Sequence, residues 1–405
     1  MRPIDVVLLG STGSIGTQAL DVVEALPERF RVVGLAAGRN ADRVIAQAKA
    51  HAVSHVAVAD RAAARQVAEA LGEDADVLDG EDGVAELATR PADVVLNGIN
   101  GAVGLRSTLA ALDTGTPVAL ANKESLIVGG DLVLDAAVRA QARAGAAPGD
   151  GPSPPLGGLR TPWLLPVDSE HSALAQTLRG TRHEEIARLL VTASGGPFRG
   201  WSRPALAEVT AADALRHPTW AMGAVITVNS ASLANKGMEV IEAHLLFGVD
   251  FDHIDVVVHP QSIVHGMVEL IDGATIAKLS PPDMRLPIQL ALGHPARLPH
   301  APARIDWAQA SRLDFEPVDT AAFPMLELAV DAGRAGGTAP AVFNAANEVA
   351  VAAFLDGQVG FLGIDGTVAA VLEVHEAAAA ADVDTVLAAD AWARARARER
   401  LTAER

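Results

Sequence analysis

The chain has 405 residues, of which 50% are hydrophobic, and a formal net charge of −18 at pH 7. This length accommodates two or three domains, and the negative charge disfavours nucleic acid or an anionic membrane surface as a partner. The absence of cysteine excludes disulfides, thiolate metal sites and a cysteine nucleophile. No 18-residue apolar run lacks charge and no targeting pattern precedes the first strand, so we expect a cytoplasmic protein.

Residues 4 to about 128 alternate short β-rich runs with alanine-rich helical patterns. This alternation is typical of an α/β fold with a Rossmann-like, doubly wound parallel sheet. The expected strands are 4–9, 31–37, 55–58, 94–96 and 117–120, with a helix at 131–144. We assign residues 1–145 to a domain that binds a dinucleotide, and residues 146–162, which are rich in Pro and Gly, to a loop or linker.

The first strand runs into a glycine-rich turn, Gly10-Ser11-Thr12-Gly13-Ser14-Ile15-Gly16, that opens a helix. Gly10 and Gly13 allow a tight turn and close backbone approach, and Gly16 lets the helix pack on the strand. A pyrophosphate would then lie at the helix N-terminus, where backbone N–H groups and the helix dipole favour anions. A purely structural turn is the alternative, but this position in an alternating chain favours dinucleotide binding.

The second strand ends in Gly38-Arg39-Asn40, where a site for NAD would usually carry an acid for the ribose 2′-hydroxyl. An acid would repel a 2′-phosphate, whereas Arg39 can bind one through two hydrogen bonds. We therefore expect NADP, with Arg39 as one surface arginine among many as the alternative. The stretch 121–125, Ala-Asn-Lys-Glu-Ser, follows the strand at 117–120 and is expected to face the nicotinamide or the substrate, unless it only caps a helix.

Arginine greatly outnumbers lysine, which occurs at positions 49, 123, 236 and 278. Lysine retained in such a chain marks places that need a compact, flexible ammonium group. Lys123 and Lys236 both fall inside motif-like stretches. Chance retention is the alternative.

The apolar run 163–167 leads to Asp168-Ser169-Glu170. Read as the end of a strand, this stretch puts Asp168 and Glu170 on one face, with Ser169 between them. Two carboxylates this close repel each other unless a cation lies between them, and Mg²⁺ or Mn²⁺ prefers such hard oxygen ligands. Glu239 could supply a third carboxylate. The alternative is a pair of solvated acids at a strand end.

We expect an α+β catalytic and metal-binding domain over 163–290, with a largely antiparallel or mixed sheet. Its expected helices are 170–180 and 236–246, and its expected strands are 186–192, 224–229, 254–258, 263–270 and 274–279. A linker over 291–323 leads to a C-terminal helical bundle over 324–405, with helices at 324–334, 340–356, 366–380 and 383–402.

Three further stretches offer a place for a phosphate group. They are 194–198 (Ser-Gly-Gly-Pro-Phe), 217–223 (His-Pro-Thr-Trp-Ala-Met-Gly) and 229–239, which includes Ser230, Asn235 and Lys236. Hydroxyls, amides and one or two cations together suit a phosphate. Taken singly, each residue is more often structural: His217 as a loop or core histidine, Trp220 and Met222 as packing residues.

Together these stretches resemble the 1-deoxy-D-xylulose 5-phosphate reductoisomerase family, which acts in the methylerythritol phosphate route to isoprenoid precursors. The matching segments follow the family's order through most of the chain: 10–16, 121–125, 164–171, 194–198, 217–223, 235–244, 259–265 and 281–288. The departures are modest. The loop at 145–162 is longer than expected for the family, and Arg39 stands where many members have lysine, which preserves the positive charge.

The resemblance implies an oxidoreductase that rearranges and reduces 1-deoxy-D-xylulose 5-phosphate to 2-C-methyl-D-erythritol 4-phosphate with NADPH and a divalent metal. It implies Mg²⁺, Mn²⁺ or Co²⁺ on Asp168, Glu170 and Glu239, and catalytic roles for Glu170, Lys123, His217 and Lys236. The implied substrate site comprises Lys123, Ser169, Glu170, Ser194, His217, Ser230, Asn235, Lys236 and Glu239. The implied NADPH contacts are Thr12, Gly13, Ser14, Ile15, Gly38, Arg39, Asn40, Asn122, Glu124 and Gly223. A lid over 200–223 and a homodimer are also implied.

The residue chemistry agrees with this reading, since a divalent ion polarises a ketose carbonyl as a Lewis acid and Glu170 is the best acid–base candidate. It does not separate a retro-aldol and aldol route from a direct 1,2-shift. Two other functions stay open: an NADP-dependent sugar-phosphate dehydrogenase without rearrangement, and a non-catalytic NADP-binding regulator. The intact carboxylates Asp168, Glu170 and Glu239 argue against the dehydrogenase. The presence of Glu170, Lys236 and Glu239 argues against the regulator.

Overall fold

The computed structural model describes residues 2–145, 157–220, 222–309 and 312–403. Within it the chain divides into two compact units. Unit 1 comprises Met1–Ser125, Val133–Arg179 and Asp283–Ala303, and unit 2 comprises Leu126–Leu132, Gly180–Pro282 and Arg304–Arg405. Most of the loop expected at 146–162 lies outside the described residues.

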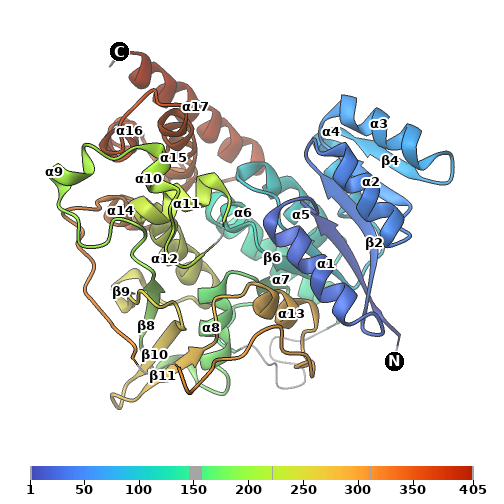
Figure 1. The fold of residues 1–405 in the computed structure, drawn as a ribbon, viewed down its shortest axis with the longest axis horizontal. Coiled ribbons are helices and arrows are strands. Elements are labelled where there is room, and N and C mark those ends of the chain that lie inside the picture. The colour runs from blue at the N-terminus through green and yellow to red at the C-terminus, as the bar shows by residue number, and fades with distance from the viewer. Residues whose placement is uncertain (1, 146–156, 221, 310–311, 404–405) are drawn as a thin grey trace. The chain divides into compact units, whose positions relative to one another are not determined.

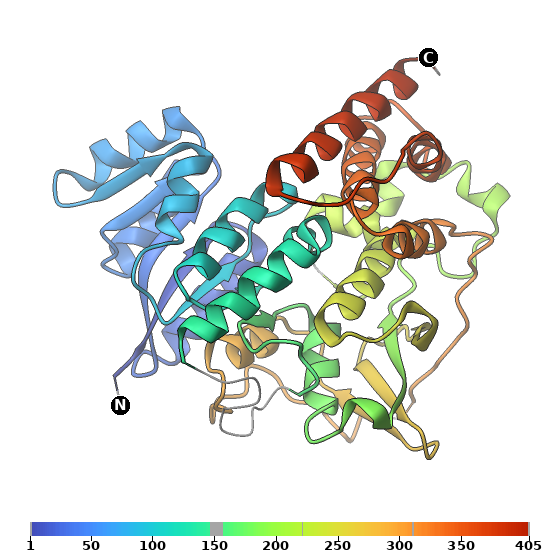
Figure 2. The same ribbon diagram turned by 180° about the vertical axis from the view of Figure 1, so that it is seen from behind.

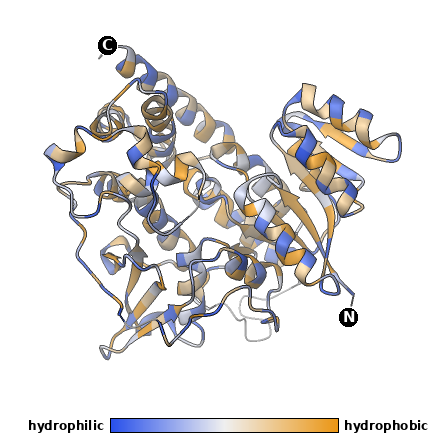
Figure 3. Cartoon of the chain, viewed as in Figure 1, coloured by the Kyte–Doolittle hydropathy of each residue, from blue (hydrophilic) through white to orange (hydrophobic). Residues whose placement is uncertain are grey.

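Unit 1 is built on a parallel sheet of seven described strands in the order β4-β3-β2-β1-β5-β6-β7. This confirms the expected α/β fold with a Rossmann-like parallel sheet. The strands are β1 (Ile4–Leu9), β2 (Phe30–Ala37), β3 (His55–Val58), β4 (Asp76–Asp79), β5 (Val94–Asn97), β6 (Val118–Leu120) and β7 (Leu164–Pro166). Strands buried on both faces read as continuous apolar runs, and Figure 3 colours these strands mostly as hydrophobic.

The helices of unit 1 connect these strands and pack against one another in pairs, α1 on α13, α2 on α3 and α4 on α5. They are α1 (Ser14–Ala25), α2 (Ala41–Ala50), α3 (Arg61–Leu71), α4 (Gly80–Leu87), α5 (Leu105–Asp113), α7 (Asp131–Arg143), α8 (Ser169–Thr177) and α13 (Arg285–Leu292), with the short η1 (Ala102–Gly104). Helix α6 (Lys123–Gly129) follows β6 and continues from unit 1 into unit 2.

The strand order reverses between β1 and β5, and such a switch point opens a crevice for ligands at the carboxyl ends of the strands. Gly10 lies there with φ +78°, a conformation that L side chains rarely adopt. A Cβ on Gly10 would lie 2.5 Å from the Gly98 carbonyl oxygen, just after β5. The glycine-rich turn therefore closes directly on the neighbouring strand.

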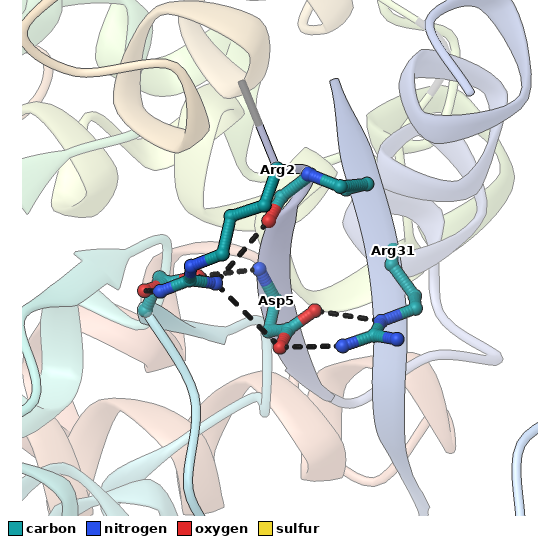
Figure 4. A network of polar contacts seen from close by, with 5 residues as sticks. Arg2, Asp5 and Arg31 are labelled. Atoms are coloured by element: carbon teal, nitrogen blue, oxygen red, sulfur yellow. Dashed lines mark hydrogen bonds and ion pairs between the residues drawn. The ribbon is translucent and has the colours of Figure 1, made fainter. Parts of the chain in front are cut away.

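A small polar network holds the amino end of this sheet (Figure 4). Asp5 of β1 accepts two hydrogen bonds of 2.8 Å from Arg31 of β2, and its backbone N–H donates to Asp93 at 2.8 Å. Arg2 binds both oxygens of Asp93, at 2.7 and 2.6 Å, and holds the pKa of that carboxyl below its usual value. Because the arginines are exposed, these pairs add little stability but fix the register of β1 against β2.

Unit 2 contains a mixed sheet of four described strands in the order β11-β10-β8-β9, in which β8 and β9 are parallel and the other pairs are antiparallel. The strands are β8 (Ile186–Ala193), β9 (Ile254–Val258), β10 (Val264–Leu270) and β11 (Thr275–Leu279). Helix α12 (Ala234–Phe247) packs on β8 and β9. This mixed sheet also agrees with the expectation from sequence.

The remaining elements of unit 2 are helical. They are α9 (Arg203–Leu206), α10 (Ala211–Ala214), α11 (Ala224–Ser232), α14 (Met325–Ala335), α15 (Ala339–Leu355), α16 (Leu362–Glu373) and α17 (Val383–Ala403), with the short η2 (His183–Glu185) and η3 (Phe251–His253). Helix α15 packs against α14, α16 and α17, so the C-terminal helices form one cluster, seen from both sides in Figures 1 and 2. No helix in the described ranges is long and apolar enough to cross a membrane.

Four local expectations were wrong. The strand expected at 224–229 is helix α11: its β-branched run favours a strand, but its buried face packs on α12 and overrides that preference. Strand β4 was missed because it is short and begins and ends with aspartate. The helix expected at 366–380 ends at Glu373. Ala378 is instead tied to Thr338: its carbonyl accepts the Thr338 N–H at 2.9 Å, and its N–H donates to Thr338 Oγ1 at 3.1 Å. Strand β7, expected to open the second region, joins the parallel sheet beside β6.

The turn after β1 generates the first prediction. Replacement of Gly10 by Ala should lower the free energy of unfolding by about 1–3 kcal/mol, because a strained backbone and a clash are imposed together. Gly38→Ala is the matched control, since a Cβ there meets nothing within 4 Å and φ is not positive. Denaturant unfolding of both variants tests this, and equal stability of the two would show that the turn tolerates a side chain.

Candidate active site

The expected cofactor residues of unit 1 lie at one edge of the parallel sheet. Thr12 and Gly13 follow β1, and Ser14 and Ile15 begin α1. The segment 38–40 follows β2, while Asn122 and Glu124 follow β6. Carboxyl ends of parallel strands share one edge, so three separate stretches of sequence meet the same crevice. Gly223, the remaining expected contact, belongs to unit 2.

Helix α2 is tied to the glycine-rich turn by two side chains that we did not expect to take part. Arg43 donates to the Thr12 carbonyl at 3.1 Å, and Gln47, one turn further along, donates to the Ser11 carbonyl at 2.9 Å. Asn40 caps the helix by accepting the Arg43 N–H at 3.1 Å, while Arg39 stays exposed. With its carbonyls held by α2, the turn can present N–H groups to a phosphate.

Asp168 and Glu170 lie on a helix start, and the expectation that they alternate along a strand was wrong. Strand β7 ends at Pro166, Asp168 is the N-cap of α8, and Ser169 and Glu170 form its first turn. Acids are favoured at these helix positions, which explains the local fold. One carboxylate oxygen of each acid nevertheless lies within 4.8 Å of the other, so the predicted proximity holds.

Asp168 forms an ion pair with Lys123, and the Ser169 hydroxyl donates to Glu170 at 2.5 Å. The Lys123 side chain is 6% exposed and that of Asp168 14%. A buried charge without a partner is very costly, so the lysine balances the acid in this part of unit 1. Lys123, Asp168, Ser169 and Glu170 are therefore gathered within one unit.

Helix α12 of unit 2 repeats the arrangement. Glu239 is buried, with 1% of its side chain exposed, and accepts hydrogen bonds from Lys236 and Asn235 on the preceding turn. Leu233, in the left-handed conformation, separates α11 from α12 and starts the turn that carries Asn235. The three expected residues of this helix thus form one cluster around a carboxylate.

The expected phosphate ligands Ser194 and Ser230 come from neighbouring elements of unit 2. Ser194 follows β8, and the turn after it has positive φ at both Gly195 and Gly196. A Cβ on Gly196 would lie 2.9 Å from the Ser230 carbonyl oxygen, so this turn packs directly on α11. The Ser194 hydroxyl oxygen accepts the Gly196 N–H at 3.2 Å.

His217 is held in one tautomer. Its Nδ1 accepts the backbone N–H groups of Thr219 and Trp220 at 3.1 and 2.9 Å. A nitrogen that accepts carries no hydrogen, so in the neutral ring Nε2 is the donor. Nε2 lies 2.9 Å from Ser194 Oγ, and burial lowers the pKa of His217, which favours the neutral form. His217 can therefore donate a hydrogen bond from Nε2 without acting as a base there.

A second histidine network was not assigned a role from the sequence, although His265 lies in a matched segment. Its Nε2 is 3.0 Å from Ser280 Oγ, which also accepts from Lys278 at 2.6 Å. Trp220 packs edge-on against the His265 ring, with centroids 6.2 Å apart. Burial, aided by Lys278, lowers the pKa of His265 to about 3. The rarity of lysine was the available signal, since Lys278 is one of the retained lysines.

Known proteins of one family are similar to this chain over nearly its full length. Family models described as 1-deoxy-D-xylulose 5-phosphate reductoisomerase, its C-terminal domain, and the DXP reductoisomerase C-terminal domain match residues 6–130, 164–247 and 279–396 respectively. The reductoisomerase of Paenarthrobacter aurescens is 52% identical, covering 99% of both chains, and that of Rhodococcus jostii is 55% identical, covering 98% of this chain and 94% of the relative. This chain belongs to the 1-deoxy-D-xylulose 5-phosphate reductoisomerase family.

Solved structures of reductoisomerases show the same fold. The Zymomonas mobilis enzyme in complex with NADPH matches with a TM-score of 0.87 and 38% identity, over 99% of both chains. A DOX-P reductoisomerase in complex with NADPH, fosmidomycin and magnesium matches with a TM-score of 0.87 and 33% identity, over 98% of both chains. The family resemblance drawn from the sequence segments is confirmed.

The lowered pKa of His217 generates a prediction on the pH dependence of stability. Its folded-state pKa lies below the ordinary 6.5, so the neutral ring stabilises the fold above pH 6.5 and this contribution is lost as the pH falls. His217→Asn keeps an acceptor for Thr219 and Trp220 but does not titrate. The loss of unfolding free energy between about pH 7.5 and about pH 5.5 should be smaller in this variant than in the wild type.

His183→Asn is the control, because His183 is an exposed histidine of the same unit. Burial lowers the pKa of His265 to about 3 and that of His294 to about 4. Both residues therefore lower the free energy of unfolding at acid pH in the wild type and in every variant. An acid response of His217→Asn that equals the wild type would contradict the lowered pKa of His217.

Proposed function

We propose that this chain converts 1-deoxy-D-xylulose 5-phosphate into 2-C-methyl-D-erythritol 4-phosphate with NADPH and a divalent metal ion. One observation carries the proposal: each unit buries a lysine against a carboxylate, Lys123 with Asp168 and Lys236 with Glu239. These pairs lie on segments of a chain that matches reductoisomerases over nearly its full length.

The metal is proposed to bind Asp168 and Glu170 of unit 1 together with Glu239 of unit 2. The donor set fits, because carboxylate oxygens suit Mg²⁺ and Mn²⁺ and the lysines already mark these positions as needing positive charge. When bound, the ion would supply Lewis-acid polarisation of the substrate's carbonyl and hydroxyl oxygens. The magnesium in solved relatives supports Mg²⁺, while Mn²⁺ and Co²⁺ are proposed on ligand chemistry alone.

The phosphate is proposed to lie near Ser194, Ser230, Asn235 and Lys236. Ser194 accepts from both Gly196 and His217, so its own hydroxyl hydrogen is available for a phosphate oxygen. With a metal ion bound to Glu239, Lys236 and Asn235 would be able to donate to the same anion. Lys123 would turn toward the substrate in the same way when the metal balances Asp168.

Proton movement is proposed to pass through Glu170, since its carboxylate already accepts the Ser169 hydroxyl at 2.5 Å and can hold or release a proton beside the substrate's hydroxyls. NADPH is proposed to lie along the carboxyl edge of the parallel sheet and to supply hydride. The expected contacts are Thr12 to Ile15, Gly38 to Asn40, Asn122, Glu124 and Gly223. Residues 200–223 are proposed as a lid that excludes water before reduction.

Other expectations remain part of the proposal. We propose three functional regions joined by linkers: a cofactor domain (1–145), a catalytic domain (163–290) and a helical domain (324–405). These regions are defined by function, whereas the two units are defined by compactness. A homodimer is proposed from the family resemblance, and a cytoplasmic location from the cysteine-free composition.

The direct test is oxidation of NADPH in the presence of 1-deoxy-D-xylulose 5-phosphate, with and without EDTA. Turnover should require the metal and should return when Mg²⁺ or Mn²⁺ is added back. A regulator would bind NADPH without turnover. Metal-independent turnover would point to a plain dehydrogenase, so either result would overturn the proposal.

Glu239→Gln should weaken Mn²⁺ binding by more than about tenfold, because even partners outside the ligand shell are worth 10–100-fold in metal affinity. NADPH binding should stay within about twofold of the wild type, since the cofactor residues lie largely on unit 1. Glu269→Gln, a partly exposed acid of β10, is the control. Parallel loss of Mn²⁺ and NADPH binding would contradict the separation of the two sites.

Arg39→Ala should raise the KM for NADPH by about tenfold or more while leaving that for NADH unchanged, since a charged hydrogen bond is worth about 1.5–3 kcal/mol. Arg61→Ala, an exposed arginine at the start of α3, is the control. Equal changes for the two cofactors would remove Arg39 from the 2′-phosphate site.

A further inference from the structure

The burial of side chains changes along the segment expected to form the lid, residues 200–223 of unit 2. In its first part, Leu206, Val209 and Ala214 are buried, with exposed fractions of 0%, 7% and 0%. Immediately afterwards Leu215 is 42% exposed, and Val225 on the following helix is 47% exposed. The first part is therefore anchored in the core of unit 2 through these three side chains, whereas the segment that starts at Leu215 lies on the surface of the unit.

Arg203, the first residue of α9, joins this first part to the C-terminal helices. Its Nη1 and Nη2 donate to the two oxygens of Asp365 at 2.8 and 2.9 Å, and Nη1 also approaches the Ala322 carbonyl at 3.4 Å. Asp365 lies in the first turn of α16, where the helix dipole favours an acid, and its side chain is 12% exposed. A bidentate pair of this kind fixes direction as well as distance.

An aromatic cluster makes a second connection to the same helices. The Phe198 ring packs edge-on against Phe361 with centroids 5.2 Å apart, and Phe361 packs likewise on Phe354 of α15 at 5.7 Å. Trp201 also packs on Phe198, with ring centroids 5.3 Å apart. Figures 1 and 2 both show the green stretch of α9 to α11 beside the orange and red C-terminal helices.

The part after Ala214 makes contacts of a different kind. His217 is hydrogen-bonded to Ser194, and Thr219 Oγ1 donates to the Pro260 carbonyl at 3.3 Å. Trp220 packs on His265. The Ser194 contact is made to a residue of the proposed substrate site, so it can change when a substrate arrives, whereas the Arg203 and Phe198 contacts need not.

We propose that Arg203 is a positioning residue whose ion pair with Asp365 holds the first part of the lid on helix α16, so that only residues after Ala214 close over the substrate. The inference rests on the proposed function, which supplies the substrate and the lid. Fewer residues would then move than in the lid expected over 200–223. The C-terminal helices would contribute to substrate binding by holding the first part of the lid. With the base fixed, His217 and Trp220 have fewer arrangements to lose when they dock.

The kinetic test uses Asp365→Asn in the full-length enzyme. The KM for 1-deoxy-D-xylulose 5-phosphate should rise by about tenfold. Without the ion pair the first part of the lid is no longer fixed, so a smaller fraction of the enzyme molecules has the lid in position to close. The kcat should stay within about twofold, since the closed complex is the same once formed. The charge exchange Arg203→Asp with Asp365→Arg should restore the KM. Asp252→Asn, which breaks the Arg334 pair elsewhere in unit 2, is the matched control.

Limited trypsin digestion provides a readout that needs no activity. In the wild type the bond after Arg216, whose side chain is 78% exposed, should be cut before the bond after Arg199, whose side chain is 42% exposed. In Asp365→Asn the bond after Arg199 should become comparably sensitive, and the charge exchange should protect it again. Mass spectrometry of the fragments distinguishes the two sites.

A variant with a lower melting temperature but an unchanged KM and digestion pattern would show that the ion pair is merely structural, and would overturn the proposal. A rise in KM that the charge exchange does not repair would also overturn it. If the wild-type enzyme showed no turnover of the sugar phosphate, the proposed function would fail instead, and the digestion pattern would still decide whether Asp365 holds the base of the segment.

Discussion

A buried carboxylate needs a positive charge beside it, and the arrangement of both units depends on that constraint. Transfer of an isolated charge from water into a protein interior is so costly that the group is paired or loses its charge. In unit 1 the cation is Lys123, beside Asp168, and in unit 2 it is Lys236, beside Glu239. Such pairs add little net stability compared with apolar residues. Their presence therefore points to a requirement for the acids themselves.

The two lysines provide local positive charge with which an acidic chain can bind an anionic substrate. With a net charge of −18, the molecule as a whole repels a sugar phosphate. Under the proposed function, Asp168 and Glu239 would be balanced by a divalent ion when one is bound. The two ammonium groups would then be available to the anionic substrate. Arginine would serve this exchange less well, because its rigid fork commits to one carboxylate.

The Rossmann-like sheet and the cofactor turn could be predicted because their signals are local. Gly10 to Gly16 follows the first strand of an alternating chain, and the positive φ of Gly10 with its close approach to Gly98 gives the physical reason for glycine there. The pattern around Asp168 was less reliable, because an acid before Ser-Glu suits a helix start as well as a strand end. The β-branched residues of α11 misled for a similar reason, since packing on α12 outweighed their preference for strands.

Contacts between distant segments could not be predicted from the sequence. Nothing in the sequence near Arg203 indicates Asp365, which is 162 residues away. The lysine–acid pairs show an intermediate case: the scarcity of lysine identified Lys123 and Lys236 as special, but the sequence could not tell whether they serve the phosphate or the acids. In the structure, each of these lysines forms an ion pair with an acid.

The proposed function requires that Asp168, Glu170 and Glu239 bind one divalent ion. Anomalous diffraction from crystals of the full-length chain grown with Mn²⁺ tests it most directly. The account predicts one manganese per chain, with oxygens of Asp168, Glu170 and Glu239 about 2.0–2.2 Å away, the range for small divalent ions. Manganese held by Asp168 and Glu170 alone, with Lys236 still paired to Glu239, would contradict it.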